Sequence, residues 1–256
     1  MKKWMLLVVV ALCLPVLGHA APKDSNLYRG DLSLQTVLGM IQQNNPLPLY
    51  ISSTGAFNGR NAKDQAIAAC NKKINQNPNY WTYYNAAIVH ASADQFEGYD
   101  VEPYLSERDL ANALRYADKA ISYYRNNPAK TVYMYLLKGE SLYNDSMFWD
   151  PYRGIRLRSS AKYARAQQAL GNYMTVEKVN PNLAPYDRMA ALAKALNKKD
   201  LAATYQDQAN ARQRKAEQES AQRAEQIRRL TRATQARVKQ KIEFMRRKFG
   251  PFGFLF

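Results

Sequence analysis

Acidic side chains crowd one short segment of a chain whose net charge is +16. The candidate acidic site consists of Asp94, Glu97, Asp100 and Glu102. Carboxylate oxygens at this density can bind Ca²⁺, although their spacing is not that of an EF-hand loop. One alternative is a surface that receives basic groups, including those of the chain's own C-terminal segment. The other is a solvated loop, in which Ser106 caps the next helix ahead of Glu107 and Asp109.

Aromatic residues form two further clusters, and aromatic side chains with arginine are enriched at the centres of binding surfaces. The first cluster consists of Tyr80, Trp81, Tyr83 and Tyr84. The second cluster follows Tyr143 and Met147 and consists of Phe148, Trp149, Tyr152 and Arg153. We take both clusters as candidate contact residues for a partner. The alternative for the second cluster is that its rings fold back over their own pair of helices.

Residues able to catalyse a reaction or hold a metal are scarce beyond residue 20. There, His90 is the single histidine and Cys70 the single cysteine, so we expect neither a zinc site nor an internal disulfide. His90 falls on an alanine-rich, aromatic segment, which favours a packed helix residue. Cys70 is predicted to be a small buried thiol. We therefore predict no enzyme, metal or cofactor, and carboxylate-only chemistry at residues 94–109 is the surviving alternative.

The C-terminal part differs in composition, because no proline or glycine occurs from residue 201 until Gly250. We predict one long charged helix over residues 201–249 and an apolar aromatic tip over residues 250–256. Residues 205–256 contain 13 basic and 5 acidic residues, a net charge of +8. The basic residues that we single out are Arg228, Arg229, Arg232, Arg246, Arg247 and Lys248.

A narrow apolar stripe from Ile227 to Phe249 accompanies these basic residues. The combination leaves three interpretations of the segment. It can dock to a partner helix or form a coiled coil, it can lie on an anionic membrane surface, or it can remain a solvated tail.

Asn-Pro dipeptides at residues 77–78, 127–128 and 180–181 divide the part before residue 200. A proline cannot continue a helix and forces the preceding residue out of the α region, so each dipeptide predicts a junction between two helices. Helices with an apolar rhythm of about 3.6 residues are predicted after each junction, over residues 80–93, 132–143 and 185–196. A first hairpin is predicted over residues 33–44 and 62–76, with Ser33 and Asn61 as helix caps.

Upstream of each Asn-Pro dipeptide, residues recur at offsets of 4 and 3. Most of these residues are small, and they are Ala66, Cys70 and Lys73, then Ala113, Ala117 and Ala120, then Ala169, Tyr173 and Val176. Such offsets place residues on one face of a helix. Small residues on that face are expected to let a neighbouring helix approach closely.

Two of these segments resemble signatures of the tetratricopeptide repeat (TPR) family. Tyr135-x-x-Lys138-Gly139-x-x-Leu142-Tyr143 is similar to its first-helix pattern, and Ala169-x-x-x-Tyr173-x-x-Val176-x-x-x-x-Pro181 to its second. The resemblance covers about residues 62–210. The family repeats about every 34 residues, whereas the prolines here are 50 and 53 residues apart. The additional residues of each repeat fall at residues 93–106 and 145–157 and in longer second helices.

The resemblance implies an all-α fold in which about three to four antiparallel helical hairpins stack over residues 24–200. It also implies a scaffold or adaptor that binds protein or peptide partners and has no chemistry of its own.

Residues 1–20 have the features of a signal peptide. Lys2 and Lys3 precede an apolar run, and Gly18 and Ala20 are small residues at the two positions that a signal peptidase inspects. We expect an exported protein, periplasmic where the cell has an outer membrane and secreted otherwise, with no nucleic acid partner. An adaptor in envelope assembly or secretion is the favoured function, and membrane-surface or cell-wall binding through the basic helix is the alternative.

Overall fold

A computed structural model describes residues 28–29, 32–51, 57, 59–92 and 105–249. The described chain is mostly helical, as the sequence predicts. Contacts divide it into two units, Met1–Ala202 and Ala203–Phe256, and each is described by itself. The predicted signal peptide at residues 1–20, the candidate acidic site at residues 94–102 and the predicted apolar tip lie outside the described residues. None of the helices described is both long enough and apolar enough to cross a bilayer.

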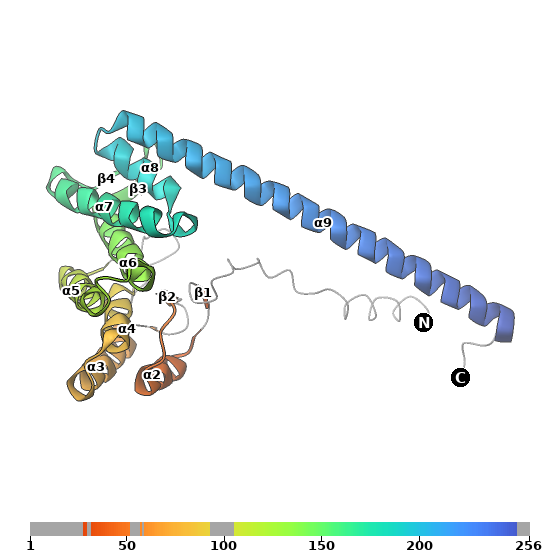
Figure 1. The fold of residues 1–256 in the computed structure, drawn as a ribbon, viewed down its shortest axis with the longest axis horizontal. Coiled ribbons are helices and arrows are strands. Elements are labelled where there is room, and N and C mark those ends of the chain that lie inside the picture. The colour runs from red at the N-terminus through yellow and green to blue at the C-terminus, as the bar shows by residue number, and fades with distance from the viewer. Residues whose placement is uncertain (1–27, 30–31, 52–56, 58, 93–104, 250–256) are drawn as a thin grey trace. The chain divides into compact units, whose positions relative to one another are not determined.

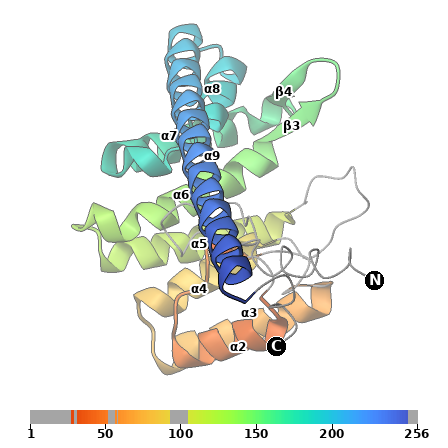
Figure 2. The same cartoon turned by 90° about the vertical axis from the view of Figure 1, so that its right-hand side faces the viewer.

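Helices follow one another through the described part of the first unit, and each packs against the next (Figure 1). They are α2 (Leu34–Gln43), α3 (Arg60–Gln76), α4 (Tyr80–Ala91), α5 (Glu107–Tyr123), α6 (Pro128–Ser146), α7 (Tyr163–Val179) and α8 (Tyr186–Ala195). A short parallel pair joins β1 (Tyr28–Arg29) to β2 (Tyr50–Ile51). An antiparallel hairpin, formed by β3 (Met147–Asp150) and β4 (Gly154–Leu157), continues directly from α6 (Figure 2).

The Asn-Pro dipeptides lie at helix boundaries, as predicted. Asn77 ends α3, and Asn180 ends α7. Asn127 caps α6 by accepting a hydrogen bond from the backbone N–H of Lys130, and Pro128 is the first residue of that helix, a position where its missing N–H costs nothing. The chain therefore reverses at these points because proline cannot extend the preceding helix.

Helix caps confirm one prediction and correct another. Ser33 accepts a hydrogen bond from the backbone N–H of Thr36 at the start of α2, as predicted. The prediction that Asn61 caps α3 is wrong, because that helix already begins at Arg60. Gly59 occupies the cap position with a φ of 94°, a backbone conformation that glycine adopts without a steric penalty.

The predicted faces of small residues are buried. Ala66, Ala117 and Ala169 have no exposed surface, and Cys70 is 2% exposed. Burial raises the pKa of the Cys70 thiol to about 12, so the thiol stays protonated and unreactive. Helices α3, α5 and α7 each pack against the helices before and after them in the described chain. Close approach of the helices is therefore the basis of the packing.

A particularly close contact joins α6 and α7. A Cβ atom placed on Gly139 would be 2.5 Å from the ring of Tyr173, a separation that real Cβ atoms do not tolerate. Tyr173 is itself fully buried, and its hydroxyl donates a hydrogen bond of 2.9 Å to the Glu140 carboxylate. The ring cannot move away without breaking that bond, so only glycine fits at position 139.

The greater part of α9 (Lys199–Phe249), which is 51 residues long, forms the second unit. The predicted helix over residues 201–249 lies within it. From Ala211 to Phe244 every residue of this helix is exposed.

We predict that Gly139→Ala lowers the free energy of unfolding by about 1–3 kcal/mol, the usual cost of overpacking a core. The measurement is urea denaturation followed by circular dichroism. Gly171→Ala in α7 is the matched control, because nothing lies within 4 Å of its added Cβ. This control should stabilise the helix by up to about 1 kcal/mol, the helix-propensity difference between the two residues. Equal effects at both sites would contradict the packing argument.

Candidate functional site

Aromatic side chains from α4, from the end of α5 and from α6 line a pocket of about 340 Å³ in the first unit. Its lining residues are Pro46, Tyr80, Trp81, Tyr84, Tyr124, Ala129, Lys130 and Tyr133. We call this the aromatic pocket. Helix α4 provides three of the rings, and the first turns of α6 provide the opposite wall. Pockets of this size accommodate one or two side chains of a partner.

The first turn of α4 is fixed by its cap. The Asn79 side chain accepts hydrogen bonds from the backbone N–H groups of Trp81 and Thr82, and the Thr82 hydroxyl in turn accepts one from the backbone N–H of Asn79. This reciprocal capping box satisfies backbone groups that a helix start otherwise leaves unpaired. It sets the direction in which Tyr80 and Trp81 leave the helix, and Tyr84 follows Tyr80 one turn later.

The rings of the aromatic pocket meet edge to face. The Tyr80 ring centroid lies 4.7 Å from that of Trp81 and 5.0 Å from that of Tyr124, with interplanar angles of 74° and 70°. Trp81 and Tyr84 are 5.5 Å apart at 75°. Such pairs are more favourable than face-to-face stacking. They leave ring faces available to line the pocket.

A hydrogen bond ties the two walls together. The Tyr80 hydroxyl donates to the backbone carbonyl of Lys130 over 2.7 Å. Burial raises the pKa values of the Tyr80 and Tyr84 hydroxyls above their usual range. Both phenols therefore remain neutral, and neither can act as a base at physiological pH.

Lys130 brings the one ammonium group among the residues that line the aromatic pocket. Its Nζ lies 4.2 Å from the centroid of the Tyr124 ring, within the range of a cation–π contact. The residue is exposed, so the charge is available to a ligand. The pocket thus combines apolar aromatic walls with a positive charge, and its described lining contains no carboxylate, histidine or cysteine.

The predicted contacts of the first cluster do not all reach this pocket. Tyr80 and Tyr84 are 6% and 4% exposed, and Trp81 is 40% exposed. Tyr83 points elsewhere, because it lies 100° around the helix from its neighbours. Its ring stacks with Tyr116 and tilts against Tyr123 of α5, at centroid distances of 6.2 and 5.8 Å.

Sequence reasoning missed the second wall of the aromatic pocket. Tyr124, Lys130 and Tyr133 come from the end of α5 and the start of α6, about 50 residues from α4. A signal was present in the Asn-Pro dipeptides, because Tyr80 and Lys130 each lie two residues after the proline. Equivalent positions of successive units are expected to be neighbours in a stack of repeats.

The second cluster forms the β3–β4 hairpin, although the sequence predicts only a loop between helices there. Met147 is buried and anchors the first strand, whereas Trp149 and Tyr152 are 62% and 95% exposed. Tyr152 and Arg153 form the turn, where their backbone N–H groups donate to the Asp150 carboxylate. Alternation of buried and exposed side chains is what a strand imposes on such a segment.

A second pocket of about 320 Å³ lies beside this hairpin. It is lined by Tyr143, Asn144, Met147, Phe148, Trp149, Ile155 and Arg188. The Arg188 guanidinium lies over the Tyr143 ring at 5.0 Å and forms an ion pair with buried Glu140. The two pockets share no residue, so the two predicted clusters form separate surfaces.

Asp109 is a buried carboxylate that joins three helices. Its oxygens accept from Arg60 Nη1 at 2.5 Å, from Lys63 Nζ at 3.2 Å and from the Ser106 hydroxyl at 3.1 Å, and they lie 3.0 Å from His90 Nδ1. Lys63, 1% exposed, also donates to the backbone carbonyls of His90 and Ser92 at the end of α4. The interpretation of a capping role for Ser106 is confirmed.

The electrostatic balance keeps Asp109 ionised. Burial opposes its charge, but hydrogen bonds from His90 and Arg60 and the nearby charge of Lys63 outweigh that effect and hold the pKa of Asp109 well below its ordinary value. Glu107, which is exposed, has its pKa lowered to about 2 by hydrogen bonds from Arg165 and Lys162 of the segment that starts α7. Glu107 and Asp109 therefore both receive basic groups, whereas the alternatives for Asp94, Glu97, Asp100 and Glu102 stay predictions, because these residues lie outside the described ranges.

Three further predictions concern His90, the metal ligands and the basic residues of the C-terminal helix. His90 is 5% exposed and bonded to Asp109, which confirms a packed helix residue. No cluster of three or more potential metal ligands occurs in the ranges described. The basic residues Arg228, Arg229, Arg232, Arg246, Arg247 and Lys248 lie exposed on α9.

Comparison with protein-family models, with curated proteins and with solved structures finds no match for this chain.

We predict that Asp109→Asn lowers the free energy of unfolding by about 3–5 kcal/mol, because it leaves buried Lys63 without its counter-charge. Chemical denaturation measures the loss. Asp118→Asn is the matched control, since Asp118 is 61% exposed and pairs with Lys138 at the surface, where an ion pair contributes about 0–1 kcal/mol. A loss of similar size in both variants would contradict the central role of Asp109.

Acid should destabilise the protein through the same groups. A carboxylate whose pKa is lowered by folding stabilises the folded state above its unfolded pKa, and that contribution disappears as the pH falls towards the folded pKa. For Glu107 this loss occurs as the pH falls from 4.5 to about 2. For Asp109 the loss begins near pH 3.8. The free energy of unfolding measured across pH 5 to 2 should fall, and Asp109→Asn should flatten that decline. An unchanged slope in the variant would assign the decline to other groups.

Proposed function

We propose that this chain is a non-enzymatic adaptor that binds an extended peptide segment of a partner protein in the aromatic pocket. The observation that supports this most is the composition of that pocket: five aromatic rings, a proline and one exposed ammonium group. Aromatic grooves are the surfaces that recognise extended, proline-containing peptides. Buried aromatic anchors also provide most of the energy at protein interfaces.

The charge of the pocket selects among such peptides. Lys130 favours a carboxylate next to the apolar residue that enters between the rings. The net charge of +16 favours acidic partners over the whole surface, and such complementarity raises the rate of association. We therefore infer a partner segment that combines proline or an aromatic residue with aspartate or glutamate.

The TPR-like architecture belongs to the same proposal. In it, α2 with α3, α4 with α5 and α6 with α7 are hairpins that stack as repeats, and the aromatic pocket lies where the second and third of these hairpins meet. The order of helix packing, the small-residue faces and the fit of Tyr173 on Gly139 support this arrangement. Stacked helical repeats commonly present peptide-binding surfaces.

Export is the other part of the proposal, and it rests on the amino-acid sequence of residues 1–20. An adaptor in that compartment would serve envelope assembly or secretion.

A library of random peptides displayed on phage tests the binding proposal. We expect selection on the immobilised protein to enrich peptides with proline or an aromatic residue beside an acidic one. Synthetic versions of the enriched peptides should bind Trp81→Ala at least about 30-fold more weakly, the loss that a hot-spot residue gives. Trp149→Ala on the β3–β4 hairpin is the matched control and should bind normally.

Lys130→Glu separates the charge preference from the packing. The Tyr80 hydrogen bond ends on the backbone carbonyl of Lys130, so the substitution leaves it in place. The variant should reject the acidic peptides and retain neutral proline-containing ones. Absence of any enrichment, or peptides that bind Trp81→Ala as well as the wild type, would overturn the proposal.

A further inference from the structure

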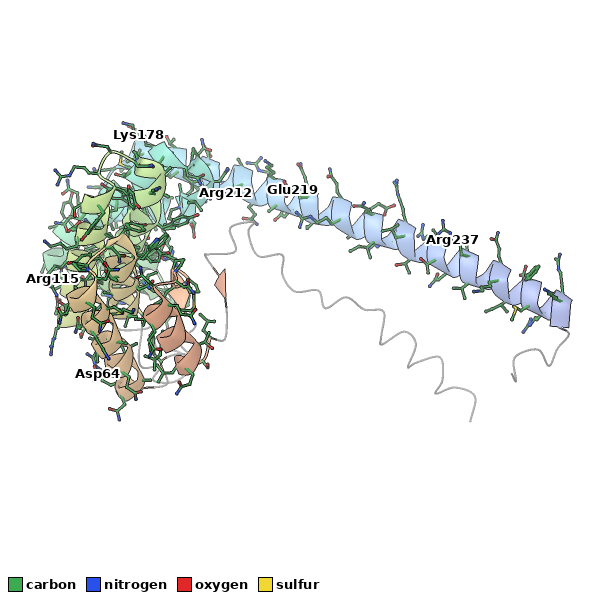
Figure 3. All side chains as sticks on the ribbon, turned by 60° about the horizontal axis from the view of Figure 1, so that its bottom comes forward. Asp64, Arg115, Lys178, Arg212, Glu219 and Arg237 are labelled. Atoms are coloured by element: carbon green, nitrogen blue, oxygen red, sulfur yellow. The ribbon has the colours of Figure 1, made fainter. Side chains whose placement is uncertain are left out.

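The two halves of α9 differ sharply in charge. Residues 205–226 contain four basic and four acidic residues, whereas residues 227–249 contain nine basic residues and one acidic residue. The entire net charge of +8 in this helix therefore lies in its last part, which we call the basic half. Figure 3 labels Arg212 and Glu219 in the balanced half and Arg237 in the basic half.

The balanced half can satisfy its own polar groups. Glu219 pairs with Arg223 at 3.7 Å, and Gln213 donates to Glu217 at 2.9 Å, both one helical turn apart. Such pairs stabilise an exposed helix without any partner. In the basic half, the single acid Glu243 cannot neutralise nine basic residues. This segment therefore attracts negative charge from outside itself.

The basic half also exposes apolar side chains along one side. Ile227, Leu230, Val238, Ile242 and Phe244 are 48%, 62%, 52%, 38% and 60% exposed. At 100° per residue, all of these except Phe244 fall, with Met245, within an arc of about 120°. An exposed apolar stripe of this length indicates an interaction surface.

Basic residues border the stripe on both sides. On a helical projection, Arg228, Arg232 and Lys239 follow one edge at about 100–140° from Ile227. Arg237 follows the other edge at about 280°, and Lys241 and Lys248, at about 300–320°, lie just inside that edge at the level of Leu230. Long basic side chains at such edges extend their charged ends to the polar layer while their stems lie on apolar surface.

A second copy of the helix does not fit this pattern. A two-stranded coiled coil needs a seam with a period of 3.5 residues. Counted from Ile227, that seam would contain Arg237, Lys241 and Lys248. Basic residues on both edges would also face their counterparts in a homodimer, and like charges repel. The apolar residues follow steps of 3 and 4 with a period nearer 3.67, which suits a helix that stays nearly straight.

We propose that residues 227–249 lie on the surface of an anionic phospholipid bilayer, with the apolar stripe in the boundary between headgroups and acyl chains. A flat surface contacts the stripe and both basic edges of a straight helix at once, as interfacial amphipathic helices do. The phosphates of anionic lipids supply the negative charge that the segment lacks. This interaction is independent of the aromatic pocket.

The test is co-sedimentation of the whole chain with vesicles of phosphatidylcholine alone and with about 30 mol% phosphatidylglycerol. We expect binding to the anionic vesicles that exceeds binding to the neutral ones by at least about tenfold at 0.05 M salt and weakens at about 0.5 M, because salt screens the attraction. All variants share the same N-terminal segment, so its contribution cancels in each comparison.

Two matched triple variants locate the interaction. Arg228→Gln with Arg232→Gln and Lys239→Gln removes one basic edge, whereas Arg212→Gln with Arg214→Gln and Lys215→Gln removes the same residue types from the balanced half. The first should lose at least about tenfold in anionic binding and the second little, since each basic residue near the membrane contributes separately. Glutamine is a good helix former, and circular dichroism checks that the helix persists.

A third variant tests the apolar stripe. Leu230→Gln with Val238→Gln keeps every charge and should also weaken binding to anionic vesicles by at least about tenfold, because two exposed apolar groups no longer enter the boundary. Equal binding by the two triple variants, or equal binding to neutral and anionic vesicles, would overturn the proposal. A dimer of the free protein in sedimentation velocity that the stripe variant abolishes would overturn it in favour of a second copy.

Discussion

Close approach of consecutive helices is the constraint on which the rest of the first unit depends. Alanine, glycine and cysteine on the facing sides of α3, α5, α6 and α7 leave room for a neighbour's backbone. Because the backbones lie so near, single buried carboxylates can reach several helices at once. Asp109 joins α3, α4 and α5, and Glu140 of α6 joins Tyr173 of α7 to Arg188 of α8. The small residues thus set the distance between neighbouring helices. The buried carboxylates determine which helices pair at that distance.

Local features of the sequence predicted the helices, because their causes are local. The Asn-Pro dipeptides at residues 77–78, 127–128 and 180–181 end or begin helices wherever they occur, since proline lacks the required N–H. Offsets of 4 and 3 identified the buried face of each helix. The β3–β4 hairpin was missed because its strands are four residues long each, too short for a period of two to stand out beside the neighbouring helix pattern.

The candidate site was only half predictable, for a different reason. Aromatic density identified Tyr80, Trp81 and Tyr84, but their opposite wall comes from residues whose proximity depends on helix packing. The buried role of Asp109 was equally hidden, because the sequence places it in an acidic segment and its partners Arg60 and Lys63 lie more than 40 residues earlier. Pairings at such separations follow from the stacked fold and leave no local pattern.

Under the proposed function, the position of the aromatic pocket limits the valency of the molecule. Tyr80 and Lys130 each follow an Asn-Pro dipeptide by two residues, and Leu183 is their equivalent after the third. At that next junction, Thr131 and Met134 of α6 replace Trp81 and Tyr84 of α4. In the proposed repeat arrangement, the second junction therefore lacks the aromatic lining of the first. A partner with several copies of the recognised segment would engage one copy per chain, so gains in avidity would have to come from bringing several chains to one surface.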